Sequence, residues 1–185
     1  MPIFEKVRDI TSYNRPKGTH GCKLTEIVPG LWTAHFEDIN QPNSFSNLPI
    51  IQPVIGLVIN AAVPYNQCPT FSGFYGPDIE VLMIELFDDP KEGEAHTDPS
   101  DARLHFDLVN NSIDQTIKEG KSALVHCYAS ISRSAVFLIA YLMKTKKMTV
   151  VEATQFVKAK WEATWPNDSF VFQLIEYQKE INGNK

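Results

Sequence analysis

A cysteine and an arginine enclose a short segment in the C-terminal half of the sequence. Cys127 follows His126, and Arg133 precedes Ser134. An apolar run, 123–125, comes before this segment, and a helix-like apolar stretch, 135–142, comes after it. The pattern predicts a strand that passes through a tight loop into a helix. The residues of the loop are Tyr128, Ala129, Ser130, Ile131, Ser132 and Arg133.

Such a loop can bind an anion, because several backbone N–H groups point to its centre and the positive end of the helix dipole lies behind them. The same field favours the thiolate, the nucleophilic form of Cys127. Arg133 can donate two N–H groups to two phosphate oxygens, which a lysine cannot do. A nucleophile beneath a cradle for a tetrahedral dianion predicts a phosphatase with a cysteinyl-phosphate intermediate. The alternative is that Cys127 is a small buried residue that ends a core strand.

At these residues the chain resembles the protein tyrosine phosphatase superfamily, and most closely its small dual-specificity phosphatases. The resemblance covers roughly residues 25–180, although the segment 36–80 agrees only in outline. Upstream of the loop, the family has an alternating strand that ends at an aspartate, and the segment 84–88 with Asp88 at its end fits this pattern. Downstream, the similar residues are Ala140, Tyr141, Leu142, Met143, Pro166, Asn167, Phe170, Gln173 and Leu174.

The chemistry and the resemblance together assign roles to five residues. We expect Cys127 to attack phosphorus, and Asp88 to give a proton to the leaving oxygen and later to take one from the attacking water. The family uses the hydroxyl that matches Ser134 to hydrogen-bond the sulfur and help it leave. We expect His126 to orient the loop and to disperse the thiolate charge, while Arg133 and the loop bind the phosphate.

Two other features of the sequence could be taken for the acid in place of Asp88. Asp89 is adjacent, but it points to the opposite face if the extended pattern continues. The segment 165–167, Trp-Pro-Asn, resembles the acid loop of the larger tyrosine-specific enzymes, but it has asparagine and follows the cysteine, so we do not expect it to supply the acid. Asp88 could also be a solvated loop carboxylate or a helix cap.

Within the superfamily, the residues favour the atypical small dual-specificity subclass. The loop contains no lysine, which lipid phosphatases of the superfamily usually carry, so we expect hydrolysis of phosphotyrosine and of phosphoserine or phosphothreonine. Two alternatives stay open: a pseudophosphatase that binds phosphate but turns over poorly, and a phosphatase of lipids or RNA 5′-phosphates. The first is kept open by Ser130, because the family normally has glycine there and a positive φ would cost a serine on the order of 1 kcal/mol.

Composition and charge are those of an ordinary globular protein with one core. Apolar residues form 43% and charged residues 21% of the 185 residues, and the net charge of −5 argues against nucleic acid or an anionic membrane as partner. The expected partner is therefore a phosphoprotein. From the lack of a long apolar run and of leader or lipidation patterns at the two ends, we expect no membrane span, signal peptide or lipid anchor. Three cysteines form no disulfide framework, which favours the cytoplasm, with the nucleus also open.

No cofactor or metal is required by this mechanism, and the five histidines show no ligand spacing with cysteine or carboxylate partners. Cys22 or Cys68 could trap an oxidised Cys127 as a disulfide, which stays an open alternative. The sequence sets no oligomeric state.

Alternating strand and helix signals predict a single α/β domain, with a central, mostly parallel sheet of about five strands flanked by helices. Its expected limits are 25–182, preceded by an N-terminal extension, 1–24, that is too short for a kinase-docking domain. Strands are predicted at 31–34, 56–60, 81–86 and 122–125. One helix is predicted where apolar residues recur at helical spacing, at Leu104, Leu108, Ile113 and Ile117. A second is predicted after a capping box at Thr149. The last helix is predicted to begin at Asn167 or Asp168, with Phe172 and Ile175 facing inward.

Overall fold

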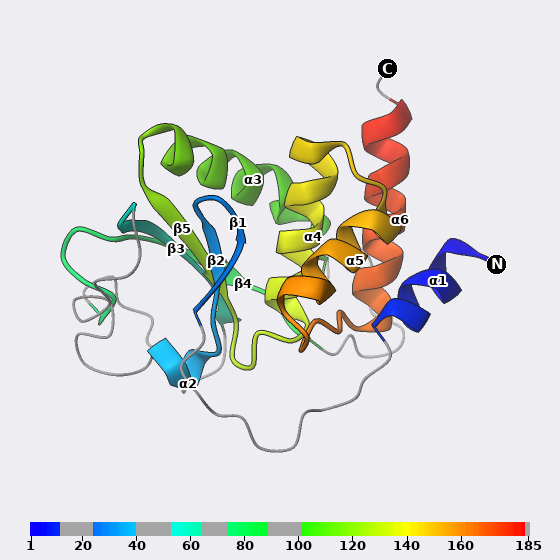
Figure 1. Ribbon diagram of the computed structural model, residues 1–185, viewed down its shortest axis with the longest axis horizontal. Coiled ribbons are helices and arrows are strands. Elements are labelled where there is room, and N and C mark those ends of the chain that lie inside the picture. Colours follow the sequence, from blue (N-terminus) through cyan, green and yellow to red (C-terminus); the bar gives the residue numbers. More distant parts are fainter. Residues whose placement is uncertain (12–23, 40–52, 64–73, 89–100, 184–185) are drawn as a thin grey trace.

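A five-stranded sheet forms the centre of the molecule (Figure 1). The computed structural model describes residues 1–11, 24–39, 53–63, 74–88 and 101–183. The strand order is β1-β2-β5-β3-β4, with β1 antiparallel to β2 and every other pair parallel. The mostly parallel α/β sheet expected from the sequence is confirmed. The strands are β1 (Thr25–Val28), β2 (Leu31–Thr33), β3 (Ile55–Val63), β4 (Glu80–Glu85) and β5 (Ser122–His126).

Both faces of the sheet are buried, which is why its central strands are continuous apolar runs rather than alternating ones. In β3, Leu57 and Ile59 belong to the larger core, whereas Val58 and Ala62 belong to a second core on the other face. All five residues of β5 are buried. The strand that leads to Cys127 is therefore fixed from both sides.

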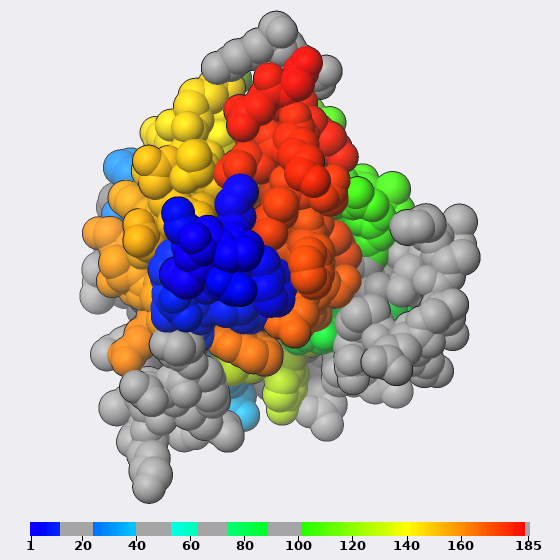
Figure 2. Space-filling view, turned by 90° about the vertical axis from the view of Figure 1, so that its right-hand side faces the viewer, coloured from blue at the N-terminus to red at the C-terminus, as the bar shows by residue number. Residues whose placement is uncertain are grey.

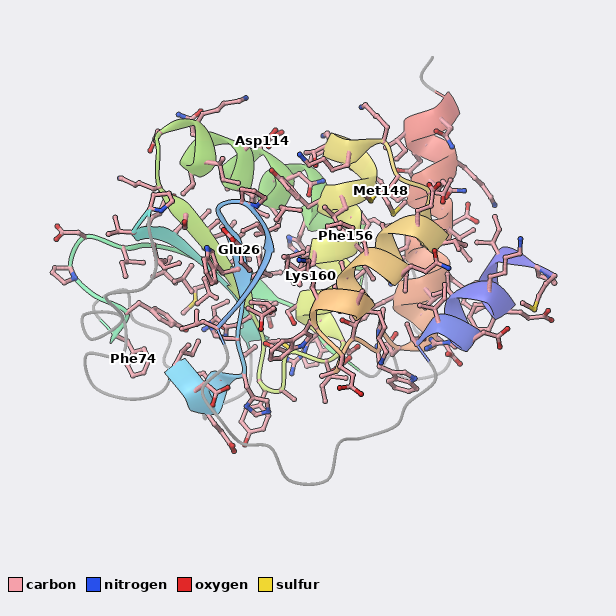
Figure 3. All side chains as sticks on the ribbon, viewed as in Figure 1. Glu26, Phe74, Asp114, Met148, Phe156 and Lys160 are labelled. Atoms are coloured by element: carbon pink, nitrogen blue, oxygen red, sulfur yellow. The ribbon has the colours of Figure 1, made fainter. Side chains whose placement is uncertain are left out.

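Helices α3 and α4 pack on β3 and β5, α5 contacts β1, and α6 and α1 pack on these helices (Figure 1). The short helix α2 contributes Phe36 and Ile39 to the second core, on the other face of the sheet. Side chains fill the space between the sheet and these helices (Figure 3). Helix α4 is the central one, because each residue from Arg133 to Met143 is buried. The helices are α1 (Ile3–Ile10), α2 (Phe36–Ile39), α3 (Arg103–Lys118), α4 (Arg133–Lys146), α5 (Val150–Lys160) and α6 (Asp168–Gly183).

The N-terminal helix α1 lies across the junction of α5 and α6 (Figure 2). Its Val7 is completely buried in the larger core. Phe4 stacks on Phe172 of α6, with the two ring centroids 4.5 Å apart. A segment that the sequence places in an N-terminal extension thus packs against the body of the domain.

The structure confirms the expected strands and helices but corrects three details. In α3, Ile113 is buried as expected, but Leu104 and Leu108 are exposed, because the buried stripe contains Phe106 and Val109 in their place. Phe172 does not face inward; it is 55% exposed and covers Phe4 instead of the core. Strand β1, which pairs with β2 across the turn at 29–30, was not predicted. The capping box of Thr149 with Glu152 is present as expected.

Candidate active site

The candidate site lies at the edge of the sheet where the parallel strands end, the usual place for a site in an open α/β sheet. The loop 127–132 leaves the end of β5 and enters α4, whose first residue is Arg133. Asp88 comes three residues after the end of β4. Because β3 lies between β5 and β4, these two chain segments emerge at the same edge.

The structure brings the cysteine, its neighbouring hydroxyl, the arginine and the acid together. Cys127 is 2% exposed, and its Sγ lies 3.6 Å from Ser134 Oγ on the first turn of α4. Arg133 is also buried; its Nη1 donates to the Leu86 carbonyl at 3.4 Å, and its Nε lies 3.5 Å from Asp88 Oδ2. The acid and the nucleophile therefore belong to one cluster, although 39 positions separate them in the sequence.

His126 is a buried neutral residue that braces the loop entrance. Its Nδ1 lies 3.1 Å from the Cys127 carbonyl oxygen, and its Nε2 lies 2.7 Å from the Tyr75 hydroxyl. A carbonyl can only accept, so Nδ1 carries the hydrogen and Nε2 accepts from Tyr75. Burial, with a smaller contribution from Arg133, lowers the pKa of His126 to about 4, against the weaker opposing effect of the Cys127 carbonyl. Both ring nitrogens thus have partners other than the sulfur, which does not fit direct hydrogen bonding to the thiolate.

Tyr75 and Asn60 extend this brace into the second core. Asn60 Nδ2 donates to the Tyr75 hydroxyl at 3.1 Å, and Asn60 Oδ1 accepts the Ala62 amide at 2.9 Å. Sequence reasoning missed both residues. No local pattern connects positions 60, 75 and 126, which meet only after the sheet has formed.

Ser130 has the left-handed backbone that the glycine position predicts, with φ at 49°. It is completely buried, and its Oγ donates to the Ala34 carbonyl at 2.5 Å and accepts the Cys127 amide at 3.3 Å. Its own carbonyl accepts from Trp161 Nε1 at 2.6 Å. This residue therefore ties the loop to the segment after β2 and to the end of α5.

The segment 165–167, which we did not expect to supply the acid, forms one side of the site. The Trp165 amide donates to the Ile131 carbonyl at 2.8 Å, and the Asn167 amide donates to Ser132 Oγ at 3.1 Å. Asn167 Nδ2 donates to the Asp88 carbonyl at 2.5 Å and lies 3.3 Å from Asp88 Oδ1. Asn167 Oδ1 also caps α6 by accepting the Phe170 amide. Asn167 thus connects the acid, the loop and the last helix.

Two sequence-based expectations fall outside the described residues: the orientation of Asp89, and the redox coupling of Cys22 or Cys68 to Cys127. Among the residues that the structure does describe, no group of three or more histidine, cysteine, aspartate or glutamate side chains could hold a metal ion. Within the same part of the chain, no helix is long and apolar enough to cross a membrane.

Comparison with known proteins identifies the family. The model of the family "Dual specificity phosphatase, catalytic domain" matches residues 43–180. The chain belongs to this family. It is a cysteine-based protein phosphatase, which is a hydrolase.

Individual relatives agree with this assignment. The Arabidopsis thaliana dual specificity protein phosphatase 1B is 30% identical over 98% of this chain and 99% of its own length. The mouse dual specificity protein phosphatase 14 is 36% identical over 70% of this chain but only 58% of its own length. The crystal structure of human DUSP28 has the same fold, with a TM-score of 0.68, 23% identity, and coverage of 86% of this chain and 95% of that one.

Proposed function

We propose that this phosphatase hydrolyses phosphotyrosine and phosphoserine or phosphothreonine in proteins, with Cys127 as the nucleophile. The observation that supports it best is the cluster of Cys127, Ser134, Arg133 and Asp88 at the N-terminal end of the buried helix α4. In the first step, the thiolate of Cys127 forms a bond to phosphorus while the bond from phosphorus to the substrate oxygen breaks. Asp88, as a carboxylic acid, gives its proton to that oxygen.

In the second step, water attacks the phosphorus of the cysteinyl-phosphate. Asp88, now ionised, takes a proton from the water, the S–P bond breaks, and inorganic phosphate leaves. Ser134 is close enough to donate to the departing sulfur. Arg133 and the loop amides bind the non-bridging oxygens in both steps. We assign His126 a positioning role, because its hydrogen bonds run to the Cys127 carbonyl and to Tyr75.

We also propose that the catalytic domain spans residues 25–182 and that its partner is a phosphoprotein. The protein would act in the cytoplasm or also in the nucleus. The net charge of −5 supports a partner other than nucleic acid or an anionic membrane. The small number of cysteines supports a reducing compartment.

Two substitutions test the reaction. Cys127→Ser should abolish turnover of p-nitrophenyl phosphate yet still bind phosphopeptide, because serine is not ionised at neutral pH while Arg133 and the loop survive. Asp88→Asn should lower kcat by at least about tenfold for phosphopeptides, whose leaving groups need a proton, and much less for fluorinated aryl phosphates. Steady-state kinetics and phosphopeptide titration supply both measurements.

The outcomes separate the proposal from its alternatives. Near-normal turnover by Cys127→Ser would contradict the covalent mechanism. A wild-type protein that binds phosphopeptide without turning it over would be a pseudophosphatase. Strong preference for phosphoinositides or RNA 5′-phosphates in a substrate panel would replace protein phosphate as the substrate class.

A further inference from the structure

Arg8 connects helix α1 to the segment 165–168 beside the candidate site. Arg8 Nη1 donates to the Pro166 carbonyl at 2.8 Å, and its Nη2 forms an ion pair with Asp168 Oδ1. The guanidinium also lies over two aromatic rings, 5.4 Å from the centroid of Phe4 and 5.2 Å from that of Trp165. The Arg8 side chain is only 18% exposed, so its contacts with Pro166 and the two rings are largely shielded from solvent, whereas the Asp168 side chain of the ion pair is 70% exposed.

The segment that Arg8 holds is the one that contacts the active site. Within 165–168, the Trp165 amide and the Asn167 amide bind the phosphate loop at Ile131 and Ser132. The Asn167 side chain binds the backbone of Asp88. Four consecutive residues therefore have Arg8 on one side and the phosphate loop and the acid on the other.

Of these contacts, the hydrogen bonds between Asn167 and Asp88 should change most when Arg8 is replaced. The phosphate loop is also fixed by β5, α4, Ala34 and Trp161, so losing one of its bonds should move it little. The Asp88 side chain is 32% exposed and follows the end of β4, where the ladder no longer holds the backbone. Its hydrogen bonds from Asn167 thus contribute a larger part of what holds it near Arg133.

We propose that Arg8 is a positioning residue for the general acid: α1 holds 165–168 in place, and Asn167 then holds Asp88 beside Arg133. The inference rests on the proposed function of Asp88. It assigns a positioning role in catalysis to helix α1, which lies outside the residues that the family model matches, 43–180. Only the full chain, with α1 docked on α5 and α6, would then have its acid fully in place.

The test compares Arg8→Ala with Lys6→Ala in the full-length protein. Lys6 is a second cation on α1, and it is exposed. Arg8→Ala should lower kcat by about tenfold for phenyl phosphate, a poor leaving group, and by less than about twofold for a fluorinated aryl phosphate. Lys6→Ala should change neither value. In an Asp88→Asn background, Arg8→Ala should have almost no further effect, because the acid through which it acts is gone.

Asp168→Asn is a milder variant that removes the ion pair from an exposed side chain, and it should reduce kcat in the same leaving-group-dependent way. Equal losses for both substrates, or an unchanged effect of Arg8→Ala in the Asp88→Asn background, would overturn the proposal. The side-chain amide resonances of Asn167 give a readout that needs no turnover, and they should shift in Arg8→Ala but not in Lys6→Ala. If the wild type is inactive, the proposed function fails, while unchanged Asn167 resonances in Arg8→Ala would refute the positioning role itself.

Discussion

Two opposite effects meet in one residue, Ser130. Its φ of 49° is a conformation that glycine adopts freely and that costs a serine on the order of 1 kcal/mol. Against this, its hydroxyl makes two buried hydrogen bonds, to the Ala34 carbonyl and from the Cys127 amide, each worth about 1 kcal/mol. The side chain that strains the loop therefore also fixes it.

This balance predicts an order among variants. Ser130→Ala keeps the strained Cβ and loses both bonds, so we expect a loss of about 2–3 kcal/mol in the free energy of unfolding. Ser130→Gly loses the same bonds but relieves the strain, so its loss should be about 1 kcal/mol smaller. Urea unfolding measures both values, and kcat/KM should fall in the same order. An alanine variant as stable as wild type would show that the two bonds contribute nothing.

At the residue scale, the sequence predicts those site residues that lie close together in the chain or that end a clear local pattern. Cys127, Arg133 and Ser134 lie within eight positions of one another, and Asp88 ends a strand with a clear alternating pattern. The residues that position them could not be predicted in the same way. Tyr75 and Asn167 reach the site from distant segments, and their contacts depend on how those segments pack.

Strand β5 carries a titratable group into the core. It is buried along its whole length, and His126 at its end is completely buried with its pKa lowered to about 4. The ordinary pKa of histidine is 6.5. Between pH 6.5 and about 4, the unfolded chain binds a proton at this position and the folded chain does not. The stability due to neutral His126 is therefore complete above pH 6.5 and is lost as the pH falls from 6.5 to about 4.

At about 1.4 kcal/mol for each pKa unit, this loss amounts to about 3 kcal/mol. We expect wild type to lose that much more unfolding free energy between about pH 7 and pH 4 than His126→Asn, whose amide can still donate to the Cys127 carbonyl but does not titrate. Urea unfolding at several pH values checks the difference. Parallel pH profiles would mean that His126 is protonated in the folded state or solvated.

The elements themselves were largely predictable, because long periodic patterns are reliable signals. The exceptions have physical reasons. Strand β1 has only four residues and depends on β2 for pairing, and α2 has only four residues. Helix α1, also not predicted, has only eight residues and packs on α5 and α6. In α3, the sequence contains two apolar stripes, and only packing against α4 and the sheet decides that Phe106 is buried and Leu104 exposed.

At the scale of the whole molecule, the candidate site joins most of the fold. The loop connects the central strand β5 to the central helix α4, Ser130 links it to α5, and the segment 165–168 links it to α6 and to α1. An anion bound in the loop contacts a part of the protein that must unfold with the rest. Its binding free energy should therefore add to the stability of the whole domain.

Tungstate, a tetrahedral oxyanion similar in shape to phosphate, provides the measurement. At about one hundred times its dissociation constant it should stabilise the fold by about 2.7 kcal/mol, which raises Tm by about 5–10 °C in a domain of this size. Arg133→Lys should lose most of this shift, because lysine cannot replace the two parallel N–H groups of the guanidinium. Arg103→Lys, which changes an arginine on α3 that pairs with Asp101, should keep it. Sodium chloride at the same ionic strength controls for screening, and a tungstate shift that survives in Arg133→Lys would place the bound anion outside the loop.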